Sequence, residues 1–338
     1  STKNFNIPTL TDPQVGPLPP GLTAQTLEIG DASLIPAGMY DDGGANDPRD
    51  YQGEITVTTG DPAVNNFVIH TDGNIVDDTD DGTGITSNAN ITLISDAGDI
   101  GTDLYPVGID SGAGVAGTGV VTAETGNVLP ADHTGNIHLI EFAGNVDLRY
   151  FEITTDANTI QTVQIAVEDS NSGSLVTSAA GTEDFTDLQA SNDDLILSAD
   201  NITIRDDIWL DAPLVAGLPD DDIRVVTLRN YSGGRNITIG PDLADQLQLY
   251  IEDSELDHLK SDGGTAPDLS VVIGRNDAGY QAGGVTISGN ADIGPDLADS
   301  LTVITGAGIT DDNQAGTVLE VAGGGSAAGT TITLDAGS

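Results

Sequence analysis

The stretch "DLILSADNITIR", from Asp194 to Arg205, contains two short segments in which apolar side chains recur at every second position. Successive side chains of a β-strand point to opposite faces, so each segment is predicted to be a strand that buries one face and offers the other to water. Turn-forming residues separate the two segments. The buried faces predicted here are Leu195 and Leu197 in the first segment, and Ile202 and Ile204 in the second.

The same two-residue period recurs from about Glu54 onward, with turn residues between the segments. Amphipathic helical windows of ordinary length do not separate these strands, which argues against an α/β fold. Trp209 is the only tryptophan, and aromatic residues are 4% of the chain, so sandwich and propeller signatures are missing. Further predicted inward faces are Ile91 and Leu93, Ile137 and Leu139, Val163, Ile165 and Val167, and Leu247, Leu249 and Ile251.

The charge of the chain excludes several classes of partner. Asp and Glu number 54 against 9 Lys and Arg, which gives a net charge of −45. Such a field repels nucleic acid and anionic membrane surfaces. The excess of Asp over Glu, with 43 Gly, favours tight turns over helix. Cysteine is absent, which excludes disulfides and thiol chemistry, and no apolar run approaches the length of a membrane helix.

Proline divides the chain into two predicted regions. Eight of the 15 prolines fall in the first 62 residues, and proline cannot donate a hydrogen bond to a strand ladder. Residues 1–50 are therefore predicted to be an irregular arm or cap, and residues 51–338 a β-solenoid. The chain begins at Ser1 rather than Met, so either a signal peptide has been removed or the chain is a piece of a longer protein.

An internal repeat favours the solenoid over the other all-β folds. "IGPDLAD" begins at Ile239 and again at Ile293, 54 positions later, and the two copies define a repeated unit at 236–289 and 290–338. The second copy is shorter in its middle, as happens when a loop leaves one coil of a stack. We interpret the copies as equivalent coils, with Leu247 and Leu249 replaced by Leu301 and Val303.

Three stretches resemble the coils of large bacterial surface proteins of the filamentous-haemagglutinin type. They are "NITLISDAGDIGTDLYPVGIDSGAG" (90–114), "GNIHLIEFAGNVDL" (135–148) and "DLILSADNITIRDDIWLDAP" (194–213). The resemblance covers about residues 54–338 and implies a right-handed parallel β-helix that is secreted and displayed as a fibre or adhesin. The N-terminal secretion domain of that family has no counterpart in this chain, so the resemblance leaves the export route open.

Two acidic loops are candidates for calcium binding. Calcium takes six to eight oxygen ligands from carboxylates, amides and carbonyls in flexible loops. "DDTDDGTG" resembles the start of an EF-hand loop through Asp77 and Asp81, but Asn88 stands where that loop needs a bidentate Glu. "DDGGAND", with Asp41 and Asp47, is the second candidate. The alternative for both loops is a solvated polar turn, and no cofactor is otherwise required.

Four asparagines head formal N-glycosylation sequons: Asn90, Asn201 and Asn236 in "NIT", and Asn230 in "NYS". The interpretation that we favour is structural. In it the Asn closes a turn, and the following residues begin a strand with Thr facing outward.

These observations predict an extracellular structural or adhesive protein that is not an enzyme. Its predicted partners are copies of itself, joined end to end or by strand addition through the N-terminal arm. The alternative is a carbohydrate-active β-helix enzyme or a glycan-binding module acting on neutral polysaccharide. Adjacent aspartates could serve a hydrolase, but pairs are expected by chance at this Asp content, and nine basic residues disfavour anionic glycans.

Overall fold

The protein was analysed as a computed structural model of the 338-residue chain. The structure describes residues 5–6, 25–29, 51–52, 55–56, 64–71, 74–76, 85–86, 90–95, 98–103, 105–110, 120–125, 135–142, 146–154, 161–168, 175–177, 194–205, 208–209, 224–240, 248–260, 269–277, 279–288, 290–293, 300–311, 318–321 and 331–336. These residues are mostly β-strand, with one helix, α1 (Asp253–Leu256), and one 3₁₀ turn (Leu148–Tyr150). The all-β class predicted from the sequence is confirmed.

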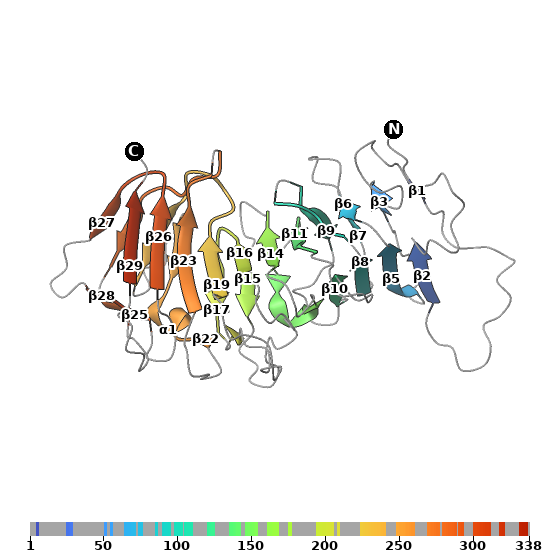
Figure 1. Cartoon of the computed structure of the whole chain (residues 1–338), viewed down its shortest axis with the longest axis horizontal. Helices are drawn as coiled ribbons and strands as arrows, with labels where there is room; N and C mark the ends of the chain where they lie inside the picture. The colour runs from blue at the N-terminus through green and yellow to red at the C-terminus, as the bar shows by residue number, and fades with distance from the viewer. Residues whose placement is uncertain are drawn as a thin grey trace, which may run out of the picture. The chain divides into compact units, whose positions relative to one another are not determined.

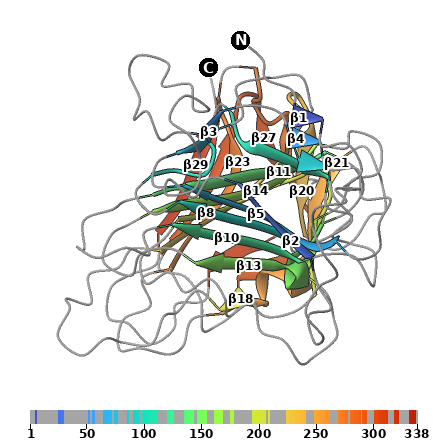
Figure 2. The ribbon, with the colours of Figure 1, turned by 90° about the vertical axis from the view of Figure 1, so that its right-hand side faces the viewer.

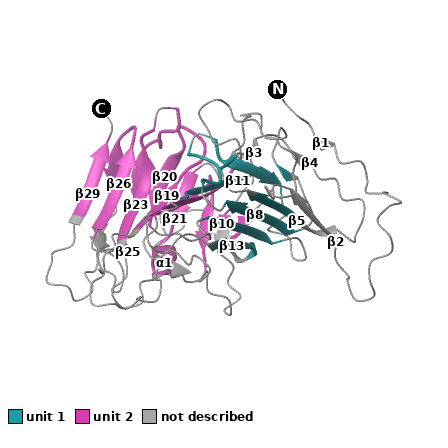
Figure 3. Cartoon of the chain, turned by 45° about the vertical axis from the view of Figure 1, so that its right-hand side comes forward, with its two compact units in different colours: residues 1–143, 150–156 teal, residues 144–149, 157–338 magenta. Residues whose placement is uncertain are grey.

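The chain divides into two compact units, coloured separately in Figure 3. Unit 1 comprises residues 1–143 and 150–156, and unit 2 comprises residues 144–149 and 157–338. Each unit contains parallel strands and buried apolar columns. The two units are therefore described one after the other.

Unit 1 contains five neighbouring strands of one parallel sheet, a second sheet of five strands and one strand pair (Figure 1). Figure 2 shows β5, β8, β10 and β13 side by side in one of these sheets. The first sheet has the order β1 (Phe5–Asn6), β4 (Ile55–Thr56), β7 (Ile85–Thr86), β9 (Val107–Asp110) and β11 (Ile137–Glu141). The second has the order β13 (Phe151–Thr154), β10 (Val121–Thr125), β8 (Asn90–Ser95), β5 (Val64–Thr71) and β2 (Gln25–Ile29), and the pair is β3 (Tyr51–Gln52) with β6 (Ile75–Val76).

Unit 2 contains six neighbouring strands of a parallel sheet, which we call its main sheet, and several smaller sheets. The main sheet has the order β14 (Thr162–Val167), β16 (Asp194–Ser198), β19 (Arg224–Arg229), β23 (Leu269–Arg275), β26 (Ser300–Thr305) and β29 (Thr331–Ala336). A three-stranded sheet contains β12 (Val146–Asp147), β15 (Leu175–Thr177) and β17 (Ile202–Ile204). A four-stranded sheet contains β21 (Gln248–Ile251), β20 (Asn236–Ile239), β24 (Val285–Ile287) and β27 (Ile309–Asp311), and two strand pairs are β18 (Ile208–Trp209) with β22 (Leu259–Lys260), and β25 (Asn290–Ile293) with β28 (Val318–Val321).

The strand pairs are parallel, and their register stacks apolar side chains into columns. In unit 1, Leu93, Ala123 and Ile153 occupy the same register on adjacent strands and are completely buried. In unit 2, Leu197, Leu228, Ile273 and Val303 do the same. Each column removes aliphatic surface from water without aromatic bulk, at about 25 cal/mol per Å² buried. The predicted inward faces are confirmed wherever the structure describes them.

The predicted exposure of the outward face fails at Ser198 on β16 and at Thr238 on β20, which are buried, and along two further strands. The outward side chains His138 and Ile140 on β11, and Gln164 on β14, are buried as well. A two-residue period reports only which residues share a face of the strand. Whether the second face is also covered depends on the rest of the fold. The prediction of one wet face is wrong at these positions.

The strands that flank the two occurrences of "IGPDLAD" lie in different sheets. β21, which follows the first "IGPDLAD", pairs with β20 in the four-stranded sheet. β26, which follows the second, lies in the main sheet between β23 and β29. The strands that follow the two heptads are therefore not equivalent in the structure. Asn236 and Gly284 occupy neighbouring strands at a separation of 48 residues, against 24 for Thr286 and Thr310.

Much of the predicted N-terminal arm lies outside the described residues. Within residues 1–50 the structure describes β1 and β2, which pair in parallel with β4 and β5. The remaining residues of the arm are not described, so the division into an arm (1–50) and a solenoid (51–338) stays a prediction. The prolines that suggested the arm lie outside β1 and β2.

Candidate functional site

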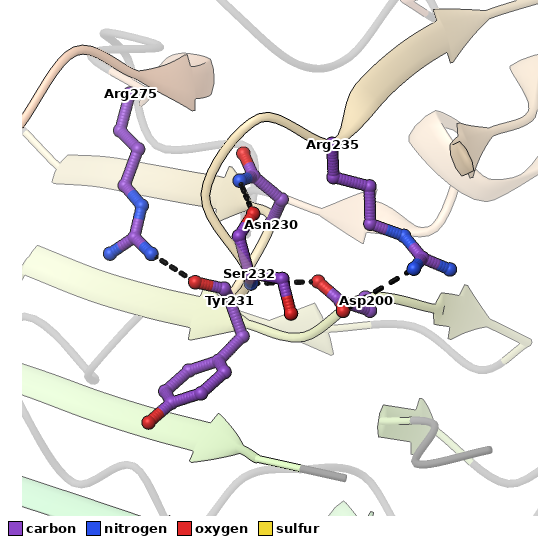
Figure 4. A network of polar contacts seen from close by, with 6 residues as sticks. All are labelled: Asp200, Asn230, Tyr231, Ser232, Arg235 and Arg275. Carbon is purple, nitrogen blue, oxygen red and sulfur yellow. Dashed lines mark hydrogen bonds and ion pairs between the residues drawn. The ribbon is translucent and has the colours of Figure 1, made fainter. Parts of the chain in front are cut away.

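Polar side chains gather in unit 2 where neighbouring strands of the main sheet end. Asp200 follows β16, while Arg229 and Arg275 are the last residues of β19 and β23. Because parallel strands end at the same edge of a sheet, these residues come together although they are far apart in the chain. Two loops continue from this edge: residues 230–235, and a second loop of which residues 276–277 and 279–284 are described. We call the cluster of Asp200, Arg229, Arg235 and Arg275 the arginine corner (Figure 4).

Asp200 is the buried anion of the arginine corner. Its Oδ1 accepts a hydrogen bond of 2.9 Å from the backbone N–H of Ser232, and Arg235 Nη1 lies 3.4 Å from its Oδ2. The residue is buried, so the positive charge of Arg235 offsets a desolvation cost that a lone carboxylate could not bear. Asn230 is completely buried beside it and donates from Nδ2 to the carbonyl oxygen of Ser232, at 2.5 Å.

Arg275 joins the two loops through their backbones. Its Nε donates to the carbonyl oxygen of Tyr280 at 2.8 Å, and its Nη2 donates to the carbonyl oxygen of Tyr231. The guanidinium carbon also lies 4.6 Å from the centre of the Tyr280 ring, within cation–π range. The rings of Tyr231 and Tyr280 are 6.4 Å apart and inclined at 57°. One buried cation therefore holds two tyrosines next to each other.

The corner concentrates positive charge in an acidic chain. Arg229, Arg235 and Arg275 are three of only nine basic residues. Asp200 and Asp277 oppose them, with Arg229 Nη1 lying 3.9 Å from Asp277 Oδ2. This donor set can orient backbone carbonyls and carboxylates, and it places aromatic rings on the surface. Ion pairs and hydrogen bonds engage Asp200, Arg235 and Arg275, while Asn230 Oδ1 is buried without a hydrogen-bond partner among the described residues.

Hydrogen bonds from Asx side chains link strands outside the corner as well. In unit 1, Asn74 Oδ1 accepts from the N–H of Asp99 at 2.8 Å, and Asp99 Oδ1 accepts from the N–H of Asn136 at 2.6 Å. Asn90 Oδ1 accepts from the N–H of Val120 at 2.9 Å. In unit 2, Asn236 Oδ1 accepts from the N–H of Gly284 at 2.9 Å. Each acceptor immediately precedes a buried Ile, and we call this pattern the Asx ladder.

The Asx ladder explains two of the four sequons. Asn90 and Asn236 are the first residues of β8 and β20, and both use their side-chain oxygen in the ladder. Asn201 is exposed and directly precedes β17, as the structural interpretation predicted. Asn230 is completely buried, and its Nδ2, the atom that would carry a glycan, donates to Ser232. A glycan at Asn230 is incompatible with this fold, and glycosylation at the other three positions stays a prediction.

Glu255 is a second buried carboxylate in unit 2, at 8% exposure. Its Oε2 accepts from the N–H of Glu252 at 2.8 Å at the start of α1, and its Oε1 accepts from the N–H of Ile204 at 3.1 Å. Burial raises its pKa from 4.5 to about 7, although the two backbone hydrogen bonds act in the opposite direction. Both oxygens are used in joining α1 to β17, so its role is structural.

The calcium candidates lie outside the described residues. Asp41, Asp47, Asp77 and Asp81 are not described, and both loops stay predictions. In the part of the chain that the structure does describe, no three His, Asp or Glu side chains gather in a way that could hold a metal ion. The described ranges also include no helix that is long and apolar enough to cross a membrane.

Sequence reasoning missed the arginine corner, although one signal was available. Four of the nine basic residues fall between positions 205 and 235 of a chain that is otherwise poor in cations: Arg205, Arg224, Arg229 and Arg235. Such local enrichment indicates a site, but Arg275 is 40 residues further on and only strand pairing brings it close. Comparisons with protein-family models, curated proteins and solved structures found no match to this chain.

Proposed function

We propose that this chain is an extracellular structural or adhesive protein that forms a right-handed parallel β-helix and self-assembles end to end into a surface filament. The resemblance to filamentous-haemagglutinin-type proteins supplies the handedness and the location. The parallel sheets of both units support the proposal, because adjacent strands such as β19, β23 and β26 follow chain order but are separated in the chain by strands of other sheets, as in successive coils of a solenoid. In this proposal the chain is not an enzyme and needs no cofactor.

The observation that carries self-assembly is the edge strand β29. Ile332 and Leu334 pair with Leu301 and Val303, which are completely buried, yet they are themselves 42% and 53% exposed. Among the described residues, β29 pairs with a strand on one side only. An open edge that carries apolar side chains in the register of a buried column is a template for one more strand.

A second copy of this chain is the partner that the proposal assigns to this edge. If a strand of that copy paired with β29, its apolar side chains would extend the two columns that end at Ile332 and Leu334. Strand addition by the arm at residues 1–50 of a neighbouring copy is the second route that we propose, and calcium at the acidic loops would modulate either route.

The experiment is sedimentation velocity over a range of concentrations, with negative-stain microscopy, in calcium and in chelator. We expect filaments from the unmodified chain. The variant Ile332→Asp combined with Leu334→Asp should remain monomeric, because it places charge in the proposed contact. The matched control is Thr333→Asp, which is exposed on the other face of the same strand and should still assemble. Monodisperse monomers of the unmodified chain at every concentration and calcium level would refute the proposal.

A further inference from the structure

The tyrosine pair of the arginine corner is placed at the surface of unit 2. Tyr280 is 45% exposed and Tyr231 is half-buried. Aromatic residues are only 4% of this chain, and the described columns are built largely from aliphatic side chains. Two neighbouring tyrosines at a corner are therefore not explained by the need for core volume. Tyrosine combines a flat apolar face with a polar tip, which suits it to contact with an amphipathic ligand.

Hydrogen bonds within the protein hold the backbones of the two tyrosines in place without a ligand. Arg275 hydrogen-bonds the backbone carbonyls of both tyrosines and lies against one ring. The two loops are also tied to each other, since Gly234 N–H donates to the carbonyl oxygen of Gln281 at 2.7 Å and Gly283 N–H donates to that of Arg235 at 2.6 Å. Preorganisation of this kind lowers the entropic cost of binding. Figure 4 shows the ring of Tyr231 extending away from Asp200 and Arg235.

The loop that carries Tyr280 has exposed polar side chains, which we call the polar rim. Asn276, Asp277 and Gln281 are exposed on the same loop as Tyr280. Together they offer amide donors, amide acceptors and a carboxylate acceptor. The flat faces of the two tyrosine rings, together with a few hydrogen-bond donors and acceptors on the same loop, are complementary to a molecule that has one apolar face and several hydroxyl groups.

The net charge of the chain and the arginines beside the tyrosines both restrict the charge of a ligand that could bind here. An anionic ligand is opposed by the net charge of −45. A cationic ligand would normally favour a tyrosine face, but Arg275 already lies over the Tyr280 ring, and Arg229 and Arg235 are close by. The remaining class is a neutral, polyhydroxylated ligand.

We propose that Tyr231 and Tyr280 form a binding site for a neutral sugar residue of a polysaccharide, with the apolar face of the pyranose on tyrosine and its hydroxyl groups bonded to Asn276, Asp277 and Gln281. This site does not depend on filament formation. A shallow surface site of this size implies weak binding by each copy, and repetition in an assembly would raise the avidity.

The experiment is calorimetry and NMR titration of the intact chain with neutral hexasaccharides: cellohexaose, maltohexaose, laminarihexaose and chitohexaose. We expect saturable binding to at least one of them. Tyr280→Ala should weaken that binding about tenfold or more, which corresponds to about 1.4 kcal/mol. Tyr280→Phe keeps the ring and should stay within about threefold of the unmodified chain.

The matched control is Tyr105→Ala, which removes another exposed tyrosine, at 50% exposure, from unit 1. It should leave affinity unchanged. Because Tyr280→Ala also removes the ring beside Arg275, a second variant, Gln281→Ala, tests the polar rim without touching that contact and should weaken binding several-fold. Circular dichroism checks that each variant is folded.

Three results would overturn the proposal. The first is no saturable binding of any of the four sugars up to about 10 mM. The second is equal loss of affinity in Tyr105→Ala and Tyr280→Ala. The third is tighter binding of hexalysine or oligogalacturonate than of every neutral sugar, which would assign the tyrosine pair to a charged partner instead.

Discussion

Unit 1 and unit 2 each contain a hydrogen bond in which an Asp side chain accepts from the backbone N–H of a residue more than 30 positions away. The two carboxylates differ in how deeply they are buried. In unit 1, Asp99 Oδ1 accepts from the N–H of Asn136, and the Asp99 side chain is only half-buried. In unit 2, Asp200 Oδ1 accepts from the N–H of Ser232, and Asp200 is buried with Arg235 beside it. Water can solvate the first carboxylate, whereas the second requires a counter-ion from the protein. The burial of the Asp200 carboxylate, rather than its hydrogen bond, is therefore the reason that it needs an arginine beside it.

Glu255 adds a third case to this comparison. It is as inaccessible as Asp200, but backbone N–H groups rather than an arginine contact its oxygens. Burial is then the largest influence on its pKa, which rises to about 7.

The largest expected effect comes from removing the buried carboxylate of the arginine corner. Asp200→Ala leaves the Ser232 N–H and the Arg235 guanidinium without that partner, so the free energy of unfolding of unit 2 should fall by about 3 kcal/mol. The matched change in unit 1, Asp99→Ala, should cost about 1 kcal/mol. Native-state hydrogen exchange at Ser232 and Asn136 measures both. Equal losses at the two sites would show that burial does not make the difference.

The next effect is a pH dependence that originates in Glu255. Because its folded pKa lies above its unfolded value, the folded state binds more protons between about pH 4.5 and 7, so its contribution to stability falls as the pH rises through this window. At about 1.4 kcal/mol per pH unit, the change is at most about 3 kcal/mol. Trp209, the single tryptophan, lies in unit 2 and reports urea unfolding there by fluorescence.

The variant Glu255→Gln should flatten this pH profile relative to the unmodified chain. The control Asp257→Asn changes an exposed acid just after α1 and should leave the profile as it is. A profile with the same slope in Glu255→Gln and in the unmodified chain would assign the pH dependence to other groups.

The smallest effects should come from the Asx ladder, graded by burial. Asn90→Ala removes a half-buried acceptor from the N–H of Val120 and should cost about 1 kcal/mol. Asn236→Ala removes an exposed one and should cost about 0.5 kcal/mol, while Asn201→Ala should stay within about 0.5 kcal/mol of zero. Urea unfolding followed by circular dichroism gives the three values. If Asn201→Ala lowered the free energy of unfolding more than the other two variants, the proposed contribution of the Asx ladder to stability would be contradicted.

Much of the local fold could be predicted because its signals are local. The alternation in "NITLI" correctly placed Ile91 and Leu93 inside, and the Asn residues of two sequons were correctly expected at strand starts. The repeat was a weaker guide, since "IGPDLAD" connects strands of different sheets in its two copies. The candidate site was not predicted, since Arg229 and Arg275 meet only because β19 pairs with β23.

The sequence by itself determined that this chain is a protein of short strands and tight turns, and which face of most strands is apolar, because side-chain alternation and turn chemistry act within a few residues. Only the tertiary structure decided which strands pair, that both faces of β11 are buried, and that three of nine cations share one corner. Those outcomes depend on contacts between residues that are far apart in the chain, such as Asn90 with Val120 and Asp200 with Ser232. The burial that such contacts create decides whether a carboxylate needs water, backbone N–H groups or an arginine.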